Sequence, residues 1–298
     1  MEVSTALTLE LGSLHQPVVT PYHLGMILFR LYQAKTYQGQ AFTRLDKAVP
    51  TPSDLKRVTD RLLKNGVLQT YPGVSGKVFT LLGQQPTAPE VACVLGPFAY
   101  LSHLSAMEYH GLTQRMPAML SLSSPSPAEW PQFALAKMKR DLGEASLEPY
   151  RTAGLPALTR PRFEKIERQV VKVYNSSHLG AYIAVRDRAL RVATVGRTFL
   201  DMIREPDLCG GIYHVVEVFE AHAATYLRLI TDEIAQHGTQ IDQARAGYLL
   251  DERCGLQSPS LDRWQAEVQR GGSRKLYAKG DYSSRFSERW SLSINIEE

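Results

Sequence analysis

The clearest pattern of hydrophobic and polar positions in the chain runs through residues 52–64. Apolar side chains recur there at the spacing of one helix face, and that face consists of Leu55, Val58, Leu62 and Leu63. The opposite face is cationic and carries Lys56, Arg57, Arg61 and Lys64. A helix of this kind can bury its apolar face in a core and place its cationic face in the major groove of DNA.

Residues at both ends of this segment favour a helix with defined limits. Thr51 suits the N-cap, Pro52 the first helical position, and Asp54 the reciprocal hydrogen bond of a capping box. Gly66 can adopt the left-handed conformation that ends a helix. The sequence therefore predicts a helix that begins at Pro52 and ends before Gly66.

The flanking segments predict two more helices and a β-hairpin. Residues 22–34 and 42–49 have helical spacing, and the second segment stops at Pro50. Residues 67–71 and 77–81 are strand-like and enclose a glycine-containing turn. Three helices followed by a hairpin are typical of a winged helix-turn-helix.

The distribution of charge favours a nucleic-acid partner for this region. Residues 21–82 contain nine Lys+Arg and three Asp+Glu, a net charge of +6, whereas the whole chain carries +4. Concentrated cations can neutralise phosphates and release their counterions. We therefore interpret residues 1–82 as a winged helix-turn-helix DNA-binding domain, in which residues 1–20 are an N-terminal extension.

We expect this domain to bind double-stranded DNA. Arg57 and Arg61 are assigned to base edges, because a guanidinium group can donate two hydrogen bonds to one guanine. Phosphate contacts are assigned to Lys56, Lys64 and Lys77, and the predicted interface also includes Ser53 and Arg44. Two alternatives stay open: a winged helix can serve as a protein-interaction module, and a charged helix face can simply be solvated.

Length and composition set further limits. A chain of 298 residues is long enough for two domains, and a hydrophobic content of 44% is ordinary for a globular protein. The sequence lacks an apolar run of membrane-spanning length and a signal-peptide pattern, so we expect a cytoplasmic protein without a membrane partner. Cys93, Cys209 and Cys254 have no paired spacing and are expected to be reduced thiols.

Residues 83–298 are interpreted as a mixed α/β domain, which makes the whole chain α+β. The polar, proline-bearing stretch 83–89 marks the predicted boundary. Strands are predicted at 169–174, 181–185 and 290–296, and helices from Gly211 onward and at 241–252. The stretch 121–127 is either a second interruption or a loop after a strand. The basic stretch 151–168 either extends the nucleic-acid footprint or, as its interleaved acids favour, begins a solvated helix.

Four short motifs occur in this second part of the chain. They are residues 101–112 (LSHLSAMEYHGL), 195–211 (VGRTFLDMIREPDLCGG), 246–251 (AGYLLD) and 284–290 (SRFSERW). In this order, and with the winged helix before them, they resemble the AbiEi-type antitoxin family, the transcription-regulating partner in type IV abortive-infection toxin–antitoxin pairs. The matching positions are Ser102, Ser105, His110, Gly111, Arg197, Thr198, Asp201, Arg204, Tyr248, Arg289 and Trp290.

The resemblance implies a transcriptional autorepressor that is also an antitoxin. It implies that two copies occupy promoter inverted repeats and that residues 83–298 supply the antitoxin function. The implied partner is a nucleotidyltransferase-like toxin, with which a stable complex is not required. Ala246 departs from the leucine of many relatives, and residues 121–168 match no family pattern.

The sequence predicts no catalytic residue, metal site or cofactor. His103 and His110 are spaced more widely than zinc motifs, and Ser105 lacks the elbow sequence of a hydrolase. Arg197 and Asp201 lie four residues apart, so they can pair on a helix and contribute about 0.3–0.5 kcal/mol if exposed. Two rival interpretations remain: a stand-alone transcription factor with a ligand- or partner-sensing domain, and an enzyme that uses the winged helix for targeting.

Overall fold

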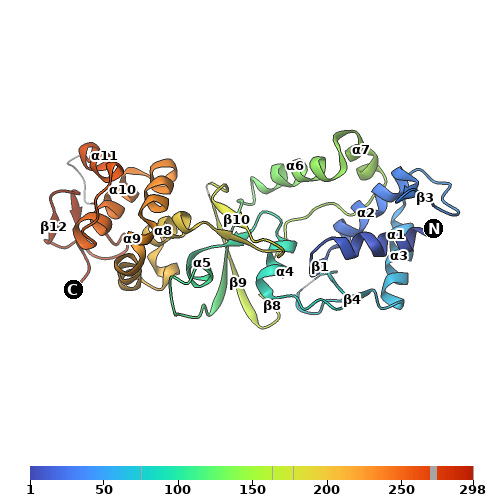
Figure 1. Cartoon of the computed structure of the whole chain (residues 1–298), viewed down its shortest axis with the longest axis horizontal. Coiled ribbons are helices and arrows are strands. Elements are labelled where there is room, and N and C mark those ends of the chain that lie inside the picture. Colours follow the sequence, from blue (N-terminus) through green and yellow to red (C-terminus); the bar gives the residue numbers. More distant parts are fainter. Residues whose placement is uncertain (75, 163, 177, 269–273, 298) are drawn as a thin grey trace. The chain divides into compact units, whose positions relative to one another are not determined.

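The computed structural model describes residues 1–74, 76–162, 164–176, 178–268 and 274–297 (Figure 1). The fold is α+β and separates into two compact units. Unit 1 comprises Met1–Ala99, Ser124–Ser177 and Ala184–Arg191, and unit 2 comprises Tyr100–Ser123, His178–Ile183 and Val192–Glu298. These limits differ from the predicted division after Leu82, because unit 1 continues to Ala99 and also contains the two later segments.

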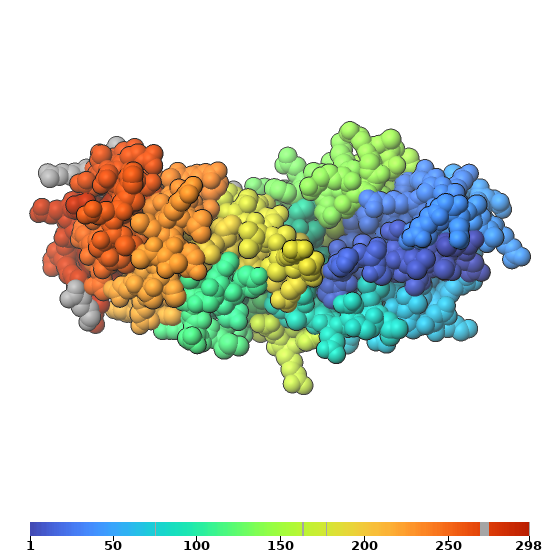
Figure 2. Space-filling model, viewed as in Figure 1, coloured from blue at the N-terminus to red at the C-terminus, as the bar shows by residue number. Residues whose placement is uncertain are grey.

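Unit 1 begins with helices and short strands in alternation. Its first elements are α1 (Val3–Ser13), β1 (Val18–Val19), α2 (Pro21–Ala34), α3 (Pro52–Lys64), β4 (Leu68–Thr70) and β5 (Phe79–Leu81). The three strands form an antiparallel sheet in the order β1-β5-β4. Helices α1, α2 and α3 contact one another, and Figure 2 shows them as one continuous mass in blue and light blue. The predicted helices at 22–34 and 52–64 and the predicted hairpin are confirmed, although Ser75 in its turn lies outside the described residues.

The first 20 residues belong to the fold itself, and their interpretation as an extension is wrong. Ala6, Leu7 and Leu11 of α1 are fully buried in the core of unit 1. Strand β1 extends the hairpin because Val18 and Val19 pair with β5. Burial of these side chains makes α1 and β1 part of the structure on which α3 rests.

The predicted helix at 42–49 is also wrong. The chain after α2 forms a small hairpin, β2 (Thr36–Tyr37) and β3 (Gln40–Ala41), and residues 42–50 form turns and irregular backbone. Arg44 has a left-handed φ of 60°, which a helix does not accept. Pro50 also disfavours helical backbone at the preceding residue.

The remaining elements of unit 1 complete its core. They are α4 (Ala88–Leu95), α6 (Trp130–Leu142), α7 (Glu144–Thr152), β8 (Lys165–Ile166) and β9 (Gln169–Asn175). The Tyr150 ring packs edge-on against Phe29 of α2 at a centroid distance of 5.4 Å, so α7 shares the core with the N-terminal helices. The stretch 151–168 does not begin a helix as expected, because Arg151 and Thr152 end α7 and the described residues after them are turns, irregular backbone and β8.

Unit 2 contains strands, helices and two tighter helical turns. Its elements are β6 (Tyr100–Leu101), α5 (His103–Tyr109), α8 (Val195–Arg204), the 3₁₀ turn η1 (Pro206–Cys209), α9 (Ile212–His237), α10 (Gln240–Gly247), the π-helical turn η2 (Tyr248–Arg253), α11 (Pro259–Glu267), β12 (Phe286–Ser287) and β13 (Leu292–Ser293). The division between the two units falls inside three further strands, β7 (Met119–Ser124), β10 (Tyr182–Ala184) and β11 (Arg191–Ala193). Leu101 of β6 pairs antiparallel with β7 and parallel with β11, so the sheet is mixed.

The core of unit 2 forms around α8 and α9. Phe199 and Phe219 meet edge-on at a centroid distance of 4.9 Å, and both are fully buried. The predicted strands at 169–174 and 181–185 and the predicted helices from Gly211 and at 241–252 are confirmed in β9, β10, α9 and α10–η2. The predicted strand at 290–296 shortens to β13. The stretch 121–127 starts inside β7, where Ser121 is buried.

Among the helices of the described residues, none combines the length and apolar composition needed to cross a membrane.

Candidate nucleic-acid interface

The N-terminus of α3 is fixed by a complete capping box. Asp54 donates its backbone N–H to Thr51 Oγ1 over 3.2 Å, and Thr51 donates its own N–H to Asp54 Oδ2 over 3.0 Å. Lys47 Nζ donates to the same carboxylate oxygen over 3.0 Å. Burial opposes ionisation of Asp54, but the hydrogen bonds from Lys47 and Thr51 outweigh it and lower the pKa to about 2. The start of the helix therefore stays charged and ordered at neutral pH.

The two faces of α3 divide as the sequence predicts. Leu55, Val58 and Leu62 are buried, and Leu63 is partly buried against the same core. The cationic residues of the other face, Lys56, Arg57, Arg61 and Lys64, are exposed, as is Ser53 in the first turn. Gly66 follows the helix with a φ of 71°, the left-handed conformation expected of a residue that stops it.

Three of these cations hold an acidic partner within unit 1. Lys56 Nζ lies 2.6 Å from Asp60, Arg57 NH2 lies 2.8 Å from Asp54, and Arg61 NH1 lies 2.6 Å from Glu2. At 78%, 69% and 52% exposure, the three cationic side chains are well solvated. In the Lys56 and Arg61 pairs the carboxylate is exposed as well, and such pairs contribute roughly 0–1 kcal/mol, so a phosphate or a base edge can replace the carboxylate at small cost. The carboxylate of Asp54 is buried, and it keeps its hydrogen bonds from Lys47 and Thr51 when Arg57 leaves.

A groove of about 540 Å³ runs between α3 and the β4–β5 hairpin. Lys56 and Thr59 border it from the helix, and Thr70 and Lys77 border it from the hairpin. The fold therefore brings two of the predicted phosphate contacts, Lys56 and Lys77, to one groove although they lie far apart in the sequence. Arg44 is exposed on the irregular segment before α3, and not on a helix as predicted.

The first family-like motif joins α5 to the sheet of unit 2. Ser102 occupies the N-cap position of α5, and Ser105 Oγ accepts the backbone N–H of Ser121 over 3.0 Å. His110 Nε2 donates to the Ala193 carbonyl oxygen over 2.7 Å, and burial lowers the pKa of this histidine. Gly111 ends the segment with a φ of 67°. These contacts give the motif an architectural role.

The second motif contains a buried ion pair. Arg197 Nε donates to Asp201 Oδ1 over 2.7 Å, and the two side chains are only 6% and 4% exposed. The pair predicted from the sequence is therefore formed, and because it is buried, the energy given for an exposed pair does not apply to it. Thr198 Oγ1 donates to the Thr194 carbonyl oxygen, and Arg204 forms an ion pair with Asp242 at 2.9 Å. Of these interactions, the Arg204 ion pair joins α8 to α10, and the other two lie within α8 and its N-cap.

The third and fourth motifs meet in space. Trp290 is fully buried, and its Nε1 donates to Asp251 Oδ2 over 3.0 Å. Arg289 Nε lies 2.6 Å from the same carboxylate oxygen. Tyr248, at the start of η2, is buried in the same core cluster. One carboxylate therefore holds both residues that end the fourth motif.

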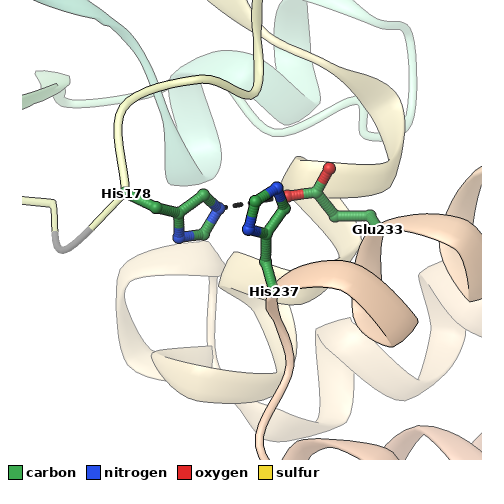
Figure 3. Close-up of side chains that lie close together, drawn as sticks. All are labelled: His178, Glu233 and His237. Atoms are coloured by element: carbon green, nitrogen blue, oxygen red, sulfur yellow. Dashed lines mark hydrogen bonds and ion pairs between the residues drawn. The ribbon is translucent and has the colours of Figure 1, made fainter.

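Unit 2 also contains a cluster of two histidines and one glutamate that the sequence analysis did not predict. His178, from the segment before β10, faces Glu233 and His237, which are four residues apart on α9 (Figure 3). His178 Nε2 lies 3.2 Å from Glu233 Oε1, and the two imidazole rings stack at a centroid distance of 4.0 Å. The pair on α9 has a helical spacing that the sequence shows, but its third member lies 55 residues upstream. These are side chains that can bind a metal ion.

Comparison with known proteins shows similarity only at the level of distant solved structures. The chain matches no known protein-family profile and no curated protein sequence. Among solved structures, the RV2827C protein from Mycobacterium tuberculosis is similar, with 14% sequence identity and a TM-score of 0.49. The similarity covers 97% of this chain and 90% of that chain. At this level it carries no argument about function.

Proposed function

We propose that this protein is a sequence-specific DNA-binding transcriptional autorepressor and the antitoxin of a type IV toxin–antitoxin pair. The observation that carries the DNA-binding part is the exposed cationic face of α3, which borders a groove with the hairpin beside it. The antitoxin part rests on the four motifs of residues 101–290 that resemble the AbiEi-type family.

The order of the first elements supports a winged helix. Three helices precede the β4–β5 hairpin, and a strand between the first two helices completes the sheet as β1-β5-β4. In this assignment α1, α2 and α3 are the three helices and β4–β5 is the wing. It differs from the sequence assignment, which counted α2 as the first helix and placed the second at 42–49.

In the proposed complex, α3 enters the major groove. Arg57 and Arg61 leave their acidic partners and bond base edges, while Lys56, Lys64 and Lys77 contact phosphates. The exposed carboxylate of Asp60 remains near the interface, where it disfavours close approach of phosphate at wrong registers. The family resemblance adds that two copies bind an inverted repeat in the promoter.

The test is a mobility-shift titration of the full chain on its own promoter region and on scrambled DNA of equal length. Repeating it between 50 and 200 mM salt separates phosphate contacts from base contacts, because only the former depend strongly on salt. We expect selective binding in two steps. Equal affinity for both DNAs would contradict a sequence-specific repressor and favour the protein-interaction alternative for the winged helix.

The antitoxin part has its own test. Co-expression with a neighbouring nucleotidyltransferase-like toxin should restore growth, and an Arg57→Ala/Arg61→Ala double variant should retain this effect while it loses repression. If the full chain does not protect cells from the toxin, the antitoxin part is contradicted. The alternative is then a stand-alone transcription factor whose second unit senses a ligand or a partner.

A further inference from the structure

We propose that His178, Glu233 and His237 form a binding site for a divalent transition-metal ion, and that zinc is the ion it fits best. The three side chains converge from two segments of unit 2, as Figure 3 shows. The three residues lie outside the DNA-binding face and outside the four motifs, and Arg197 of the second motif contacts His178.

The geometry is close to that of a tetrahedral site. One ligand atom from each of the three residues lies within 4.8 Å of those from the other two. Zinc bonds of about 2.0–2.1 Å place tetrahedral ligand atoms roughly 3.3 Å apart. The distance of 3.2 Å between His178 Nε2 and Glu233 Oε1 already matches this value. The two imidazole rings stack with an interplanar angle of 11°, so at least one ring must turn before both direct a nitrogen lone pair at the same ion. Glu233 and His237 already share one face of α9.

The contacts of His178 Nε2 conflict with each other in the absence of a cation. Arg197 NH1 can only donate to this nitrogen, from 2.9 Å, while the carboxylate of Glu233 can only accept, from 3.2 Å. A ring nitrogen carries either a proton or a lone pair, so it satisfies one of the two. A metal ion bonds the lone pair and the carboxylate together. Arg197 NH1 keeps a hydrogen bond to the His178 carbonyl oxygen at 3.1 Å when this occurs.

The surrounding charges also accept a dication. Arg197 is paired with Asp201, and Arg204 is paired with Asp242. With Glu233, these two cations and three anions leave one unit of negative charge around the two imidazoles. Two histidines and one glutamate are a known zinc ligand set in which water occupies the fourth position.

The experiment is a zinc titration of the full-length protein after chelator treatment, with a chromophoric chelator as competitor. We expect one zinc per chain in the wild type. His237→Ala and Glu233→Gln should each lower the affinity at least about 100-fold. His222→Ala is the matched control, because His222 is a partly buried histidine on the same helix outside the cluster, and its affinity should equal that of the wild type.

Two further measurements keep the result interpretable. Circular dichroism of each metal-free variant shows whether it is folded, and Glu233→Gln preserves the shape of the side chain if His237→Ala does not fold. X-ray absorption of the zinc complex reports the ligand atoms: a nitrogen and oxygen shell at about 2.0–2.1 Å supports the site, whereas sulfur at about 2.3 Å assigns the zinc to a cysteine. Sulfur ligation, less than one zinc per chain, or undiminished affinity in the folded Glu233→Gln variant would overturn the proposal.

Discussion

The indole ring of Trp290 lies against the backbone of Gly247, so that a Cβ atom built on this glycine would stand 2.2 Å from the ring carbon Cζ3. The two residues belong to the third and fourth family-like motifs, 43 positions apart in the chain. Gly247 ends α10 with ordinary helical backbone angles, so the need for glycine here is the space occupied by Trp290 and not the conformation.

Gly247→Ala should therefore destabilise the protein. We expect the free energy of unfolding to fall by about 1–3 kcal/mol, because the added Cβ forces the fully buried indole to move. Urea unfolding measures the change. Gly12→Ala in α1 is the matched control, since a Cβ there meets no atom within 4 Å. That substitution should stabilise by roughly 0.4–1 kcal/mol. Equal effects of the two substitutions would refute the packing explanation.

Arg57→Ala and Arg61→Ala should each weaken binding to the operator by about 1–3 kcal/mol while binding to scrambled DNA changes little. The reason is that each guanidinium is assigned to a base edge. Arg151→Ala is a close control, because Arg151 is an exposed arginine of unit 1 that holds an i,i+3 partner, Glu148, as Arg57 holds Asp54. Titration by fluorescence anisotropy checks this, and a parallel loss on both DNAs would reassign the arginines to phosphate.

Lys77→Ala should lower the affinity of the protein for DNA of any base sequence, because Lys77 is assigned to a phosphate. Loss of one phosphate contact reduces the slope of log K against log salt concentration by about 0.9. Lys172→Ala, on an exposed position of β9, should leave the slope unchanged. The measurement is the same anisotropy titration at several salt concentrations. A slope that Lys77→Ala does not alter would remove the hairpin from the interface.

Asp201→Ala should destabilise unit 2 by about 3–5 kcal/mol, because it leaves the buried guanidinium of Arg197 without its carboxylate. Replacing both residues, as Arg197→Met with Asp201→Leu, should restore most of this loss, since no buried charge then remains unpaired. Thermal and urea unfolding compare the three proteins. If the double variant is as unstable as Asp201→Ala, the ion pair itself and not the isolated charge supports α8.

Stability should also depend on pH through His23. This ring accepts the backbone N–H of Thr20 at Nδ1, and burial, helped by Lys137, lowers the His23 pKa from 6.5 to about 4. The unfolded chain therefore binds the proton first, so stability falls as pH drops from about 6.5 towards 4. His23→Gln keeps an acceptor in the capping box but does not titrate. From pH 7 to pH 5 the wild type should lose about 1–2 kcal/mol more than this variant.

Part of the fold could be predicted from the sequence, because some residues determine the structure of their immediate neighbours. Thr51, Asp54 and Gly66 each act within a few residues, so the limits of α3 follow directly from the chemistry of capping. Helix α1 was not predicted, because apolar side chains occur on both of its faces: Leu9 is 46% exposed, while Leu7 and Leu11 are buried. The helix predicted at 42–49 was wrong for the opposite reason. Leu45 and Val49 have helical spacing and do pack against the core, but they do so from irregular backbone.

The candidate sites show the same limit. The cationic face of α3 is a property of one helix and could be predicted. The groove shared by Lys56 and Lys77 and the meeting of Gly247 with Trp290 depend on chain segments brought together by folding. The burial of Arg197 and Asp201 could not be predicted for the same reason, because spacing on a helix fixes which residues meet and not whether another element covers them.

Helix α9 is a single rod of 26 residues, and at 1.5 Å per residue it is about 39 Å long. Glu233 and His237 lie at one end of this rod, and Ile212 packs into the core at the other. Between these ends, the buried apolar side chains of α9 from Val215 to Ile234 belong to one hydrophobic core cluster. One helix therefore carries both two of the proposed ligands and the packing of that core, so an ion that binds only the folded chain would also stabilise this core.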